Sequence, residues 1–461
     1  MDTQNTLHEK FIPLMQELIQ NKCVNTGKKE SAQEIRSVKS LQRFFAQYGI
    51  KGEVFEPESG RASLLVKFPG RDNSAPSLMF MGHLDVVPAD PAQWTYDPFA
   101  GVVAEDHVWG RGALDMLNMT AGQAVALAER FGKKENPYGD IYYLALADEE
   151  ASGTLGAKWL TENHWEKVKA DYMVTELGGF FVYAKAKTKK NAPKGILVSI
   201  GEKGVGWCRI RISGTAGHGS MPYKSDNAVV KAAEAVRLLN TMPPYIKLSP
   251  AYLAMARGLA INPLQKMLLS SKKTINWGIS LFPKSMSGIA KSLHAASRMT
   301  VSPNIISAGS KVNVIADKAE VDADIRILPN QSIEDVTRIL EKRLRRIDKR
   351  LKVEPLDYFP SNVSSDNTPL MSAIKDIIDK NYPDIKKIPM FIGGVTDGRY
   401  WRKKGTTVYG FTLFAEDMSL TEYANRLHGV DERVSLNSLQ KTLDFFYELP
   451  ESFYRHFKNG E

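Results

Sequence analysis

The sequence has few cysteines and no long hydrophobic run. Only Cys23 and Cys208 occur among 461 residues, and they do not form a Cys-x-x-Cys pair. This argues against a disulfide framework and agrees with a reducing compartment. No segment approaches the roughly 18 uninterrupted apolar residues of a membrane span, and the N-terminus lacks the pattern of a signal peptide. We therefore expect a cytoplasmic protein with no membrane partner.

Acidic residues are also in the minority. Asp and Glu number 52 against 61 Lys and Arg, which gives a net charge of +9 and a pI of about 9.1. The basic residues are dispersed, with only short clusters such as residues 343–350, which are typical of a solvated helix face. Neither a recognition motif nor a long basic stripe is present, so we expect no nucleic-acid partner. Attraction of anionic substrates is the alternative reading of the charge.

Length and hydrophobic patterning indicate two domains. A chain of 461 residues exceeds the usual size of a single core. Short apolar runs alternate with helical patterns up to residue 175, which predicts an α/β domain with a mostly parallel sheet flanked by helices. The strands are expected at residues 63–68, 77–82, 141–147 and 172–175, and the helices at residues 6–20, 120–131 and 153–163.

The pattern changes near residue 204 and changes back near residue 366. Residues 207–212 alternate like a half-exposed antiparallel strand. We expect a catalytic domain formed by residues 1–203 and 358–461, and an inserted α+β domain over residues 204–357. Within it, the Met-rich segment at about 243–299 is expected to form a helical hairpin. Further elements are expected at residues 227–239, 312–315, 319–327, 333–347, 370–381 and 436–449.

Polar residues with metal-binding chemistry follow the apolar runs. His83 follows a strand, and Asp85 lies two residues further, where its carboxylate can accept the second ring N–H. Asp115 follows two glycines before a helix, where a carboxylate can bridge two ions or simply cap the helix. Taken alone, His83 is as well explained by a hydrogen-bonded histidine at a strand end.

Three further acids and a late histidine complete the set. Glu149 and Glu150 are adjacent at the end of an apolar run, and Glu176 ends the next one. Adjacent carboxylates repel and usually need a cation nearby, although a solvated loop is the bland alternative. His428 precedes the last helix. Two zinc ions that share Asp115 would need about this number of ligands.

The ordered motifs resemble one zinc metallopeptidase family over nearly the whole chain. They are His-Leu-Asp-Val-Val-Pro, Gly-Arg-Gly-Ala-Leu-Asp-Met, Asp-Glu-Glu, Gly-His-Gly-Ser-Met-Pro, Gly-Gly-Val-Thr-Asp-Gly-Arg and a late His. The family includes aminoacylase, carboxypeptidase G, carboxypeptidase S and succinyl-diaminopimelate desuccinylase. The resemblance implies one zinc site formed by His83, Asp115 and Glu176. It implies a second formed by Asp115, Glu150 and His428.

The resemblance also implies roles for other residues. Glu149 would be the general base, Asp85 would orient His83, and the Asp115–Met116 peptide bond would be cis. The inserted domain would be a lid and dimerisation domain whose His218 stabilises the oxyanion in the partner's active site. The implied substrate-binding residues are Asn313, Arg326, Gly394 and Arg399. Without the family pattern, His218 is a surface histidine and Arg326 a strand-face ion pair.

The expected function is therefore a homodimeric, dinuclear zinc hydrolase of amide bonds, in which Co²⁺ or Mn²⁺ could replace Zn²⁺. Its substrates would be small peptides or N-acyl amino acids with a free carboxylate. One alternative is a deacetylase or desuccinylase of a small N-acyl metabolite. Another is a non-catalytic metal-bearing binding protein.

The sequence departs from the family pattern at two places. Residues 116–118, Met-Leu-Asn, stand where many members of the family have a Lys-Gly pair. The segment 243–299 is longer than in compact members of the family.

Overall fold

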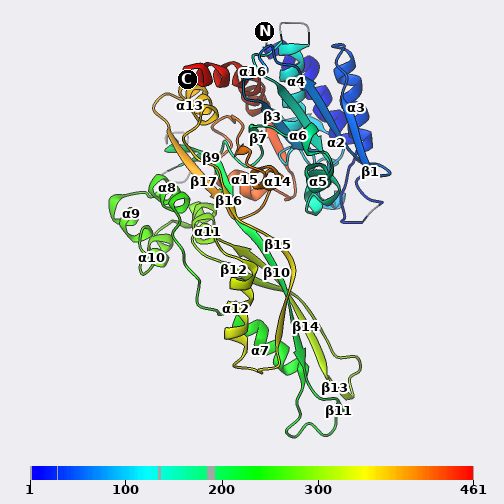
Figure 1. The fold of residues 1–461 in the computed structure, drawn as a ribbon, viewed down its shortest axis with the longest axis vertical. Helices are drawn as coiled ribbons and strands as arrows, with labels where there is room; N and C mark the ends of the chain where they lie inside the picture. The colour runs from blue at the N-terminus through cyan, green and yellow to red at the C-terminus, as the bar shows by residue number, and fades with distance from the viewer. Residues whose placement is uncertain (1–2, 29, 133–135, 184–192, 460–461) are drawn as a thin grey trace.

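The computed structural model describes residues 3–28, 30–132, 136–183 and 193–459. Figure 1 shows two parts: a broad body, which contains both termini, and a long arm that extends away from it. The body holds a ten-stranded sheet and the arm a four-stranded sheet. At the far end of the arm lie two short strands, β11 (Gly217–His218) and β13 (Val314–Ile315).

The body sheet has a parallel centre and antiparallel margins. The strand order is β1-β2-β6-β3-β7-β18-β9-β16, and β8 and β17 also pair with β9. The pairs β6–β3, β3–β7, β7–β18 and β17–β9 are parallel. This confirms the predicted α/β class. The strands are β1 (Glu53–Glu58), β2 (Arg61–Phe68), β3 (Leu78–His83), β6 (Ile141–Leu146), β7 (Tyr172–Thr175), β8 (Phe181–Val182), β9 (Gly195–Glu202), β16 (Asn362–Val363), β17 (Lys386–Ile392) and β18 (Thr407–Gly410).

Helices cover both faces of this sheet because successive strand residues point to opposite sides. On β6, Tyr143 belongs to the larger core and the next residue, Leu144, to a second core. The larger core packs α2 (Ile12–Gln20), α3 (Ile35–Ala46), α4 (Leu117–Phe131), α13 (Pro369–Asn381) and α16 (Leu436–Asn459). The second packs η4 (Thr154–Lys158), α5 (Trp159–Asn163), α6 (Trp165–Val168) and α14 (Gly398–Lys403). The last helix was predicted to end at residue 449, but it continues through Pro450.

The arm is an antiparallel sheet of order β12-β14-β10-β15, covered by two helices. As the alternating pattern predicted, Cys208, Ile210 and Ile212 are buried and form part of the arm's core. The chain passes between the two sheets from Glu202 to Gly204 and from Phe359 to Asn362. The elements are β10 (Gly204–Ser213), α7 (Ala228–Asn240), β12 (Thr300–Ala308), β14 (Lys318–Ile327), α12 (Ile333–Leu344) and β15 (Lys352–Phe359).

The segment predicted as a helical hairpin contains four helices and packs on the body. Buried Tyr252, Met255 and Leu293 belong to the body's larger core, and α8 and α11 contact β17. The helices are α8 (Pro250–Leu259), α9 (Pro263–Leu269), α10 (Ile275–Ser280) and α11 (Ser287–Ala296). Among all described residues, no helix has the length and apolar character needed to cross a bilayer.

Candidate metal centre

The predicted metal ligands lie at one edge of the body sheet. Strand β3 ends at His83, β6 ends two residues before Asp148, and β7 ends just before Glu176. These strands are parallel neighbours, with His83 paired to Leu146. Parallel strands present their carboxyl ends at the same edge, where α/β proteins bind ligands. The sheet therefore brings together side chains that are far apart in the sequence.

Two groups of ligand atoms meet at Asp115. The first is His83, Asp115 and Glu176, and the second is Asp115, Glu150 and His428; within each group, the atoms lie within 4.8 Å of one another. Asp115 Oδ1 is 3.2 Å from His83 Nε2, and Asp115 Oδ2 is 3.1 Å from His428 Nε2. One carboxylate thus offers one oxygen to each group.

The electrostatics of these residues suit a pair of cations. Burial raises the pKa of Glu149 and of Glu176 well above the usual range of a glutamate, and neighbouring carboxylates raise both further. Glu150 Oε2 is 3.4 Å from His428 Nε2, while its Oε1 is buried without a hydrogen-bond partner. Buried carboxylates without counter-charge are costly, and carboxylate with imidazole is a zinc-type donor set. These residues therefore fit two divalent ions.

Asp85 links the histidine to the turn that carries the two glutamates. Its carboxylate accepts hydrogen bonds from the backbone N–H groups of Glu149, at 3.1 Å, and Glu150, at 3.0 Å. The predicted contact with His83 differs in its atom: His83 Nδ1 lies 2.9 Å from the backbone oxygen of Asp85 and 3.7 Å from its carboxylate. The carboxylate therefore mainly positions Glu149 and Glu150.

A buried ion network below this turn escaped the sequence analysis. Arg61 donates two hydrogen bonds to Glu34, at 2.8 and 2.9 Å, and one to Asp148, at 2.7 Å. Asn25 Nδ2 joins the carboxylates of Asp85, at 2.8 Å, and Asp148, at 3.1 Å. An arginine that begins an otherwise apolar strand was the available signal, since a buried guanidinium needs partners.

The turn that carries Asp115 is held by Glu432. Strands β5 (His107–Trp109) and β19 (Arg433–Ser435) pair, which brings these distant segments together. Glu432 accepts hydrogen bonds from the backbone N–H of Leu114, at 2.7 Å, and of Asp115, at 3.1 Å, and from Arg111, at 2.7 Å. The Asp115–Met116 peptide bond is cis, as the resemblance implied.

A cavity of about 800 Å³ opens onto both ligand groups. Asp115, Glu149, Glu150, Glu176 and His428 line it, together with the predicted Gly394, Arg326 and Arg399. Arg326 donates to Asp324 at 2.7 Å, and Arg399 donates to the backbone oxygen of Ser152 at 2.8 Å. Yet Arg326 Nη1 and Arg399 Nε are buried without a hydrogen-bond partner. Each guanidinium is thus tethered and keeps a free donor.

One further buried acid near this site was missed by the sequence prediction. Asp397 is 2% exposed, and neither carboxylate oxygen has a hydrogen-bond partner. Burial raises its pKa to about 7. It packs against Gly153, where an added Cβ would lie 2.2 Å from Asp397 Oδ1. Asp397 lies inside the Gly-Gly-Val-Thr-Asp-Gly-Arg motif, so its place in the sequence was the available signal.

His218 and Asn313 lie apart from this cavity. His218 is in β11 and Asn313 precedes β13, at the far end of the arm from the body (Figure 1). Both are exposed, and His218 Nδ1 is 2.7 Å from Ser220 Oγ. The structure therefore does not bring this chain's own His218 and Asn313 to its own metal ligands.

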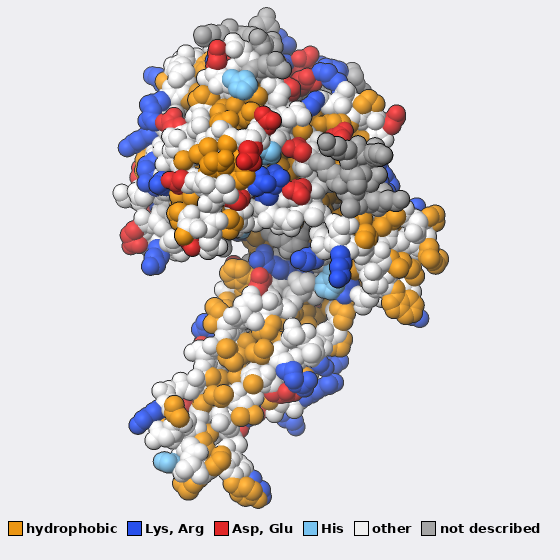
Figure 2. Space-filling model, turned by 180° about the vertical axis from the view of Figure 1, so that it is seen from behind, with side chains coloured by type: hydrophobic (Ala, Val, Ile, Leu, Met, Phe, Trp, Pro, Cys, Tyr) orange, Lys and Arg blue, Asp and Glu red, His pale blue; other side chains and the backbone are white. Residues whose placement is uncertain are grey.

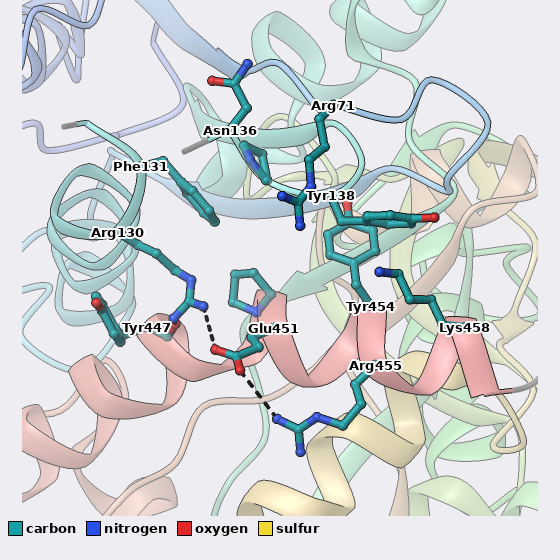
Figure 3. Close-up of a pocket in the computed structure, with 12 residues that line it drawn as sticks. Arg71, Arg130, Phe131, Asn136, Tyr138, Tyr447, Glu451, Tyr454, Arg455 and Lys458 are labelled. Atoms are coloured by element: carbon teal, nitrogen blue, oxygen red, sulfur yellow. Dashed lines mark hydrogen bonds and ion pairs between the residues drawn. The ribbon is translucent and has the colours of Figure 1, made fainter. Parts of the chain in front are cut away.

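A second cavity, of about 1090 Å³, lies along α16 and contains none of the predicted residues (Figure 3). Its basic side chains are already engaged: Arg130 pairs with Glu451 at 2.7 Å, and Lys458 Nζ lies 3.7 Å from the centre of the Tyr138 ring. The chemistry expected of the protein therefore belongs to the smaller cavity.

Comparisons with known proteins agree with this site. The family model described as Peptidase family M20/M25/M40 matches residues 79–452. Probable carboxypeptidase S-like 2 of Dictyostelium discoideum is 26% identical over 84% of this chain and 73% of its own length. The N-fatty-acyl-amino acid synthase/hydrolase PM20D1 of Xenopus tropicalis is 28% identical over 89% of this chain and 78% of its own length.

A solved structure shares the whole fold. The M20 family metallo-carboxypeptidase Sso-CP2 from Sulfolobus solfataricus superimposes with a TM-score of 0.70 at 15% identity, covering 98% of this chain and 99% of that one. The family match spans most of the chain, including every predicted metal ligand. The chain thus belongs to peptidase family M20/M25/M40 and is a metal-dependent peptidase or amidohydrolase of that family.

Proposed function

We propose that this enzyme hydrolyses the amide bond of N-acyl amino acids and small peptides that end in a free carboxylate, with two Zn²⁺ ions that Co²⁺ or Mn²⁺ can replace. One observation carries the proposal: a single cavity is lined by residues of both ligand groups and by two guanidinium groups with a free donor each. The names of two relatives, a probable carboxypeptidase S-like protein and an N-fatty-acyl-amino acid synthase/hydrolase, support the same class of substrate.

Glu149 is the proposed general base. His83, Asp115 and Glu176 would hold one ion, and Asp115, Glu150 and His428 the other. When bound, such ions lower the pKa of water from about 15.7 towards 7. Glu149 lines the cavity but belongs to neither group, so it can take the proton of the attacking water and pass it to the leaving amine. Burial, which raises its pKa, suits a carboxyl that must hold a proton between these steps.

The rest of the cavity indicates how a substrate is held. Arg326 Nη1 and Arg399 Nε would bind the substrate carboxylate through charge-assisted hydrogen bonds. Trp207, Tyr358 and Phe359 form an aromatic wall that favours a hydrocarbon or aromatic acyl group. Lysines at the same cavity favour a second candidate, hydrolysis of an anionic acyl group such as succinyl. They are Lys158, Lys403 and Lys404.

A substrate panel with Glu149→Gln tests the reaction. The zinc-loaded protein would be assayed on N-lauroyl, N-acetyl and N-succinyl amino acids and on dipeptides, by release of the free amine. Glu149→Gln should retain two metal ions per chain and lose about 10²- to 10⁴-fold in kcat. Glu166→Gln, at an exposed helix position, is the matched control. Wild-type kcat in Glu149→Gln would refute the base, and a panel without turnover would refute the reaction.

We further propose that the arm, formed by β10, α7, β12, β14, α12 and β15, is a dimerisation domain that supplies His218 to the partner's cavity. The position of His218 at the far end of the arm supports this, since its own cavity lies where the arm joins the body. Strand β12 is an edge of the arm sheet and exposes Ile305 and Ile306, and α7 exposes Val230. An exposed apolar edge strand readily pairs with a second chain.

Subunit mixing tests the exchange of His218. Glu149→Gln and His218→Ala homodimers should each be impaired, and a mixed dimer should contain one intact site. Random reassortment should therefore restore about a quarter of the wild-type activity. Mixing Glu149→Gln with a Glu149→Gln/His218→Ala chain is the control that must stay inactive. A monomer in light scattering, or no recovery on mixing, would contradict the exchange.

A further inference from the structure

Acidic residues are absent from one long stretch of the chain. Residues 235–316 contain ten Lys and Arg and no Asp or Glu, whereas the rest of the chain contains 51 basic and 52 acidic residues. The entire positive excess of the protein therefore comes from this stretch. A surface with one sign of charge creates a field that attracts partners of the opposite sign.

The outermost helices of this stretch are α9 and α10. Helices α8 and α11 contact strand β17 of the body, whereas the main contacts of α9 and α10 are with each other and with α8 and α11. Figure 1 shows them at the margin of the molecule, where they project beside the body. Their outer sides are therefore free to meet a large partner.

These helices expose large apolar side chains among the lysines. Leu264 and Met267 are 58% and 62% exposed, and Trp277 and Leu281 are 69% and 51% exposed. Leu264 and Met267 lie three residues apart on α9, and Trp277 of α10 lies four residues before Leu281, which caps that helix, so each pair shares one side of its helix. Exposed lysines accompany them at Lys266, Lys272, Lys273 and Lys284. Figure 2 shows hydrophobic and basic side chains together on this helical projection.

We propose that α9 and α10 bind the surface of membranes that contain anionic phospholipids. Such a surface offers an apolar layer for Trp277, Leu281, Leu264 and Met267 and phosphates for the lysines, and Trp is favoured at this boundary. The field of an anionic membrane attracts each nearby Lys, and residues 235–316 hold no carboxylate to oppose it. A second copy of the same surface would be repelled by its like charge, so self-association is disfavoured here.

Vesicle sedimentation of the full chain tests the proposal. Vesicles of phosphatidylcholine alone would be compared with vesicles containing about 30 mol % phosphatidylglycerol. The bound fraction should be at least about tenfold higher on the anionic vesicles, and about 0.5 M NaCl should lower it by screening. Trp277→Ser/Leu281→Ser and Lys272→Glu/Lys273→Glu should each reduce binding by about tenfold, because both apolar and basic contacts are needed.

Matched controls separate this surface from general charge and hydrophobicity. Lys342→Glu/Lys349→Glu makes the same change of charge elsewhere, with Lys342 in α12 and Lys349 just after it. Unlike residues 235–316, this helix also contains the acidic residues Glu334, Asp335 and Glu341. Leu356→Ser removes a similarly exposed apolar residue, 48% exposed, from β15. Both control variants should bind like wild type.

Three results would overturn the proposal. They are equal binding to neutral and anionic vesicles, an equal loss of binding in the control variants, and binding to soluble polyglutamate without binding to vesicles. The last would indicate an acidic protein as partner. The binding measurement does not depend on the reaction catalysed, and all variants should keep the wild-type unfolding midpoint.

Discussion

Carboxylates crowd the cavity at the ends of β3, β6 and β7, whereas residues 235–316 contain none. Below the turn that carries Glu149 and Glu150, buried charged groups have defined partners at short distances, as Arg61 has in Glu34 and Asp148. On α9 and in the segments before and after α10, the lysines are exposed and act together through their field. Buried charges are therefore expected to respond strongly to single substitutions, and exposed ones weakly. Substitutions of both kinds test this difference.

The largest effect is expected from the buried Arg61. Arg61→Met leaves Glu34 and Asp148 without their counter-charge and should lower the free energy of unfolding by about 3–5 kcal/mol, measured by urea denaturation. Arg43→Met removes a comparable but exposed pair with Glu17 and should cost less than about 1 kcal/mol. Equal losses in the two variants would remove the distinction between buried and exposed charges.

Arg399 should affect substrate binding in addition to stability. Arg399→Met removes Nε, a buried donor without a hydrogen-bond partner, so kcat/KM should fall about 10- to 100-fold for substrates with a free carboxylate. Substrates whose carboxylate is replaced by a methyl ester should be cleaved equally by both proteins. A uniform loss on acids and esters would show that Arg399 acts elsewhere.

Lys203 should make stability depend on pH. Its ammonium lies fully buried between body and arm, and donates to the backbone oxygen of Arg298 at 2.8 Å and to Thr300 at 2.9 Å. Burial and the nearby Arg326 lower its pKa to about 7, against the opposing charge of Asp324. The unfolded chain, with a lysine pKa of about 10.4, therefore binds the proton over a range in which the native protein does not.

Stability should consequently rise with pH in this range. Relative to Lys203→Met, the free energy of unfolding should increase by about 1.4 kcal/mol per pH unit from about pH 7.5 to 9.5, and flatten below about pH 6. Denaturation curves of both proteins across this range provide the measurement. Parallel pH dependences would show that Lys203 keeps its ordinary pKa.

The smallest effect is expected in the segment between α9 and α10. Lys272→Glu/Lys273→Glu changes exposed side chains, so the free energy of unfolding should stay within about 0.5 kcal/mol of wild type. The same denaturation assay applies. A loss of several kcal/mol would mean that these lysines support the fold and would weaken the contrast with Arg61.

Local patterns predicted the strand ends of the site well. Apolar runs located β3, β6 and β7, and each delivers a ligand or the base within three residues of its end. Since parallel strands share an edge, the proximity of His83, Glu150 and Glu176 followed from the strand pattern. The family motifs added Asp115 and His428, which lie in irregular segments without periodicity.

The supporting contacts could not be predicted from local patterns. Glu432 meets Leu114 only because β5 and β19 pair across more than three hundred residues. Asn25 likewise reaches Asp85 and Asp148 from an irregular segment. Lys and Arg are dispersed along the chain, whereas Asp and Glu are missing from one long stretch. That absence distinguishes residues 235–316.

Asp115 offers one oxygen to each histidine. A substitution there would alter both halves of the centre at once, whereas a change at Glu176 or His428 touches only one. A chain that lost Glu176 or His428 would still keep one complete group of three ligands, whereas a chain without Asp115 would keep neither. A change towards a single ion is therefore expected to begin at a residue that belongs to only one group, and not at Asp115.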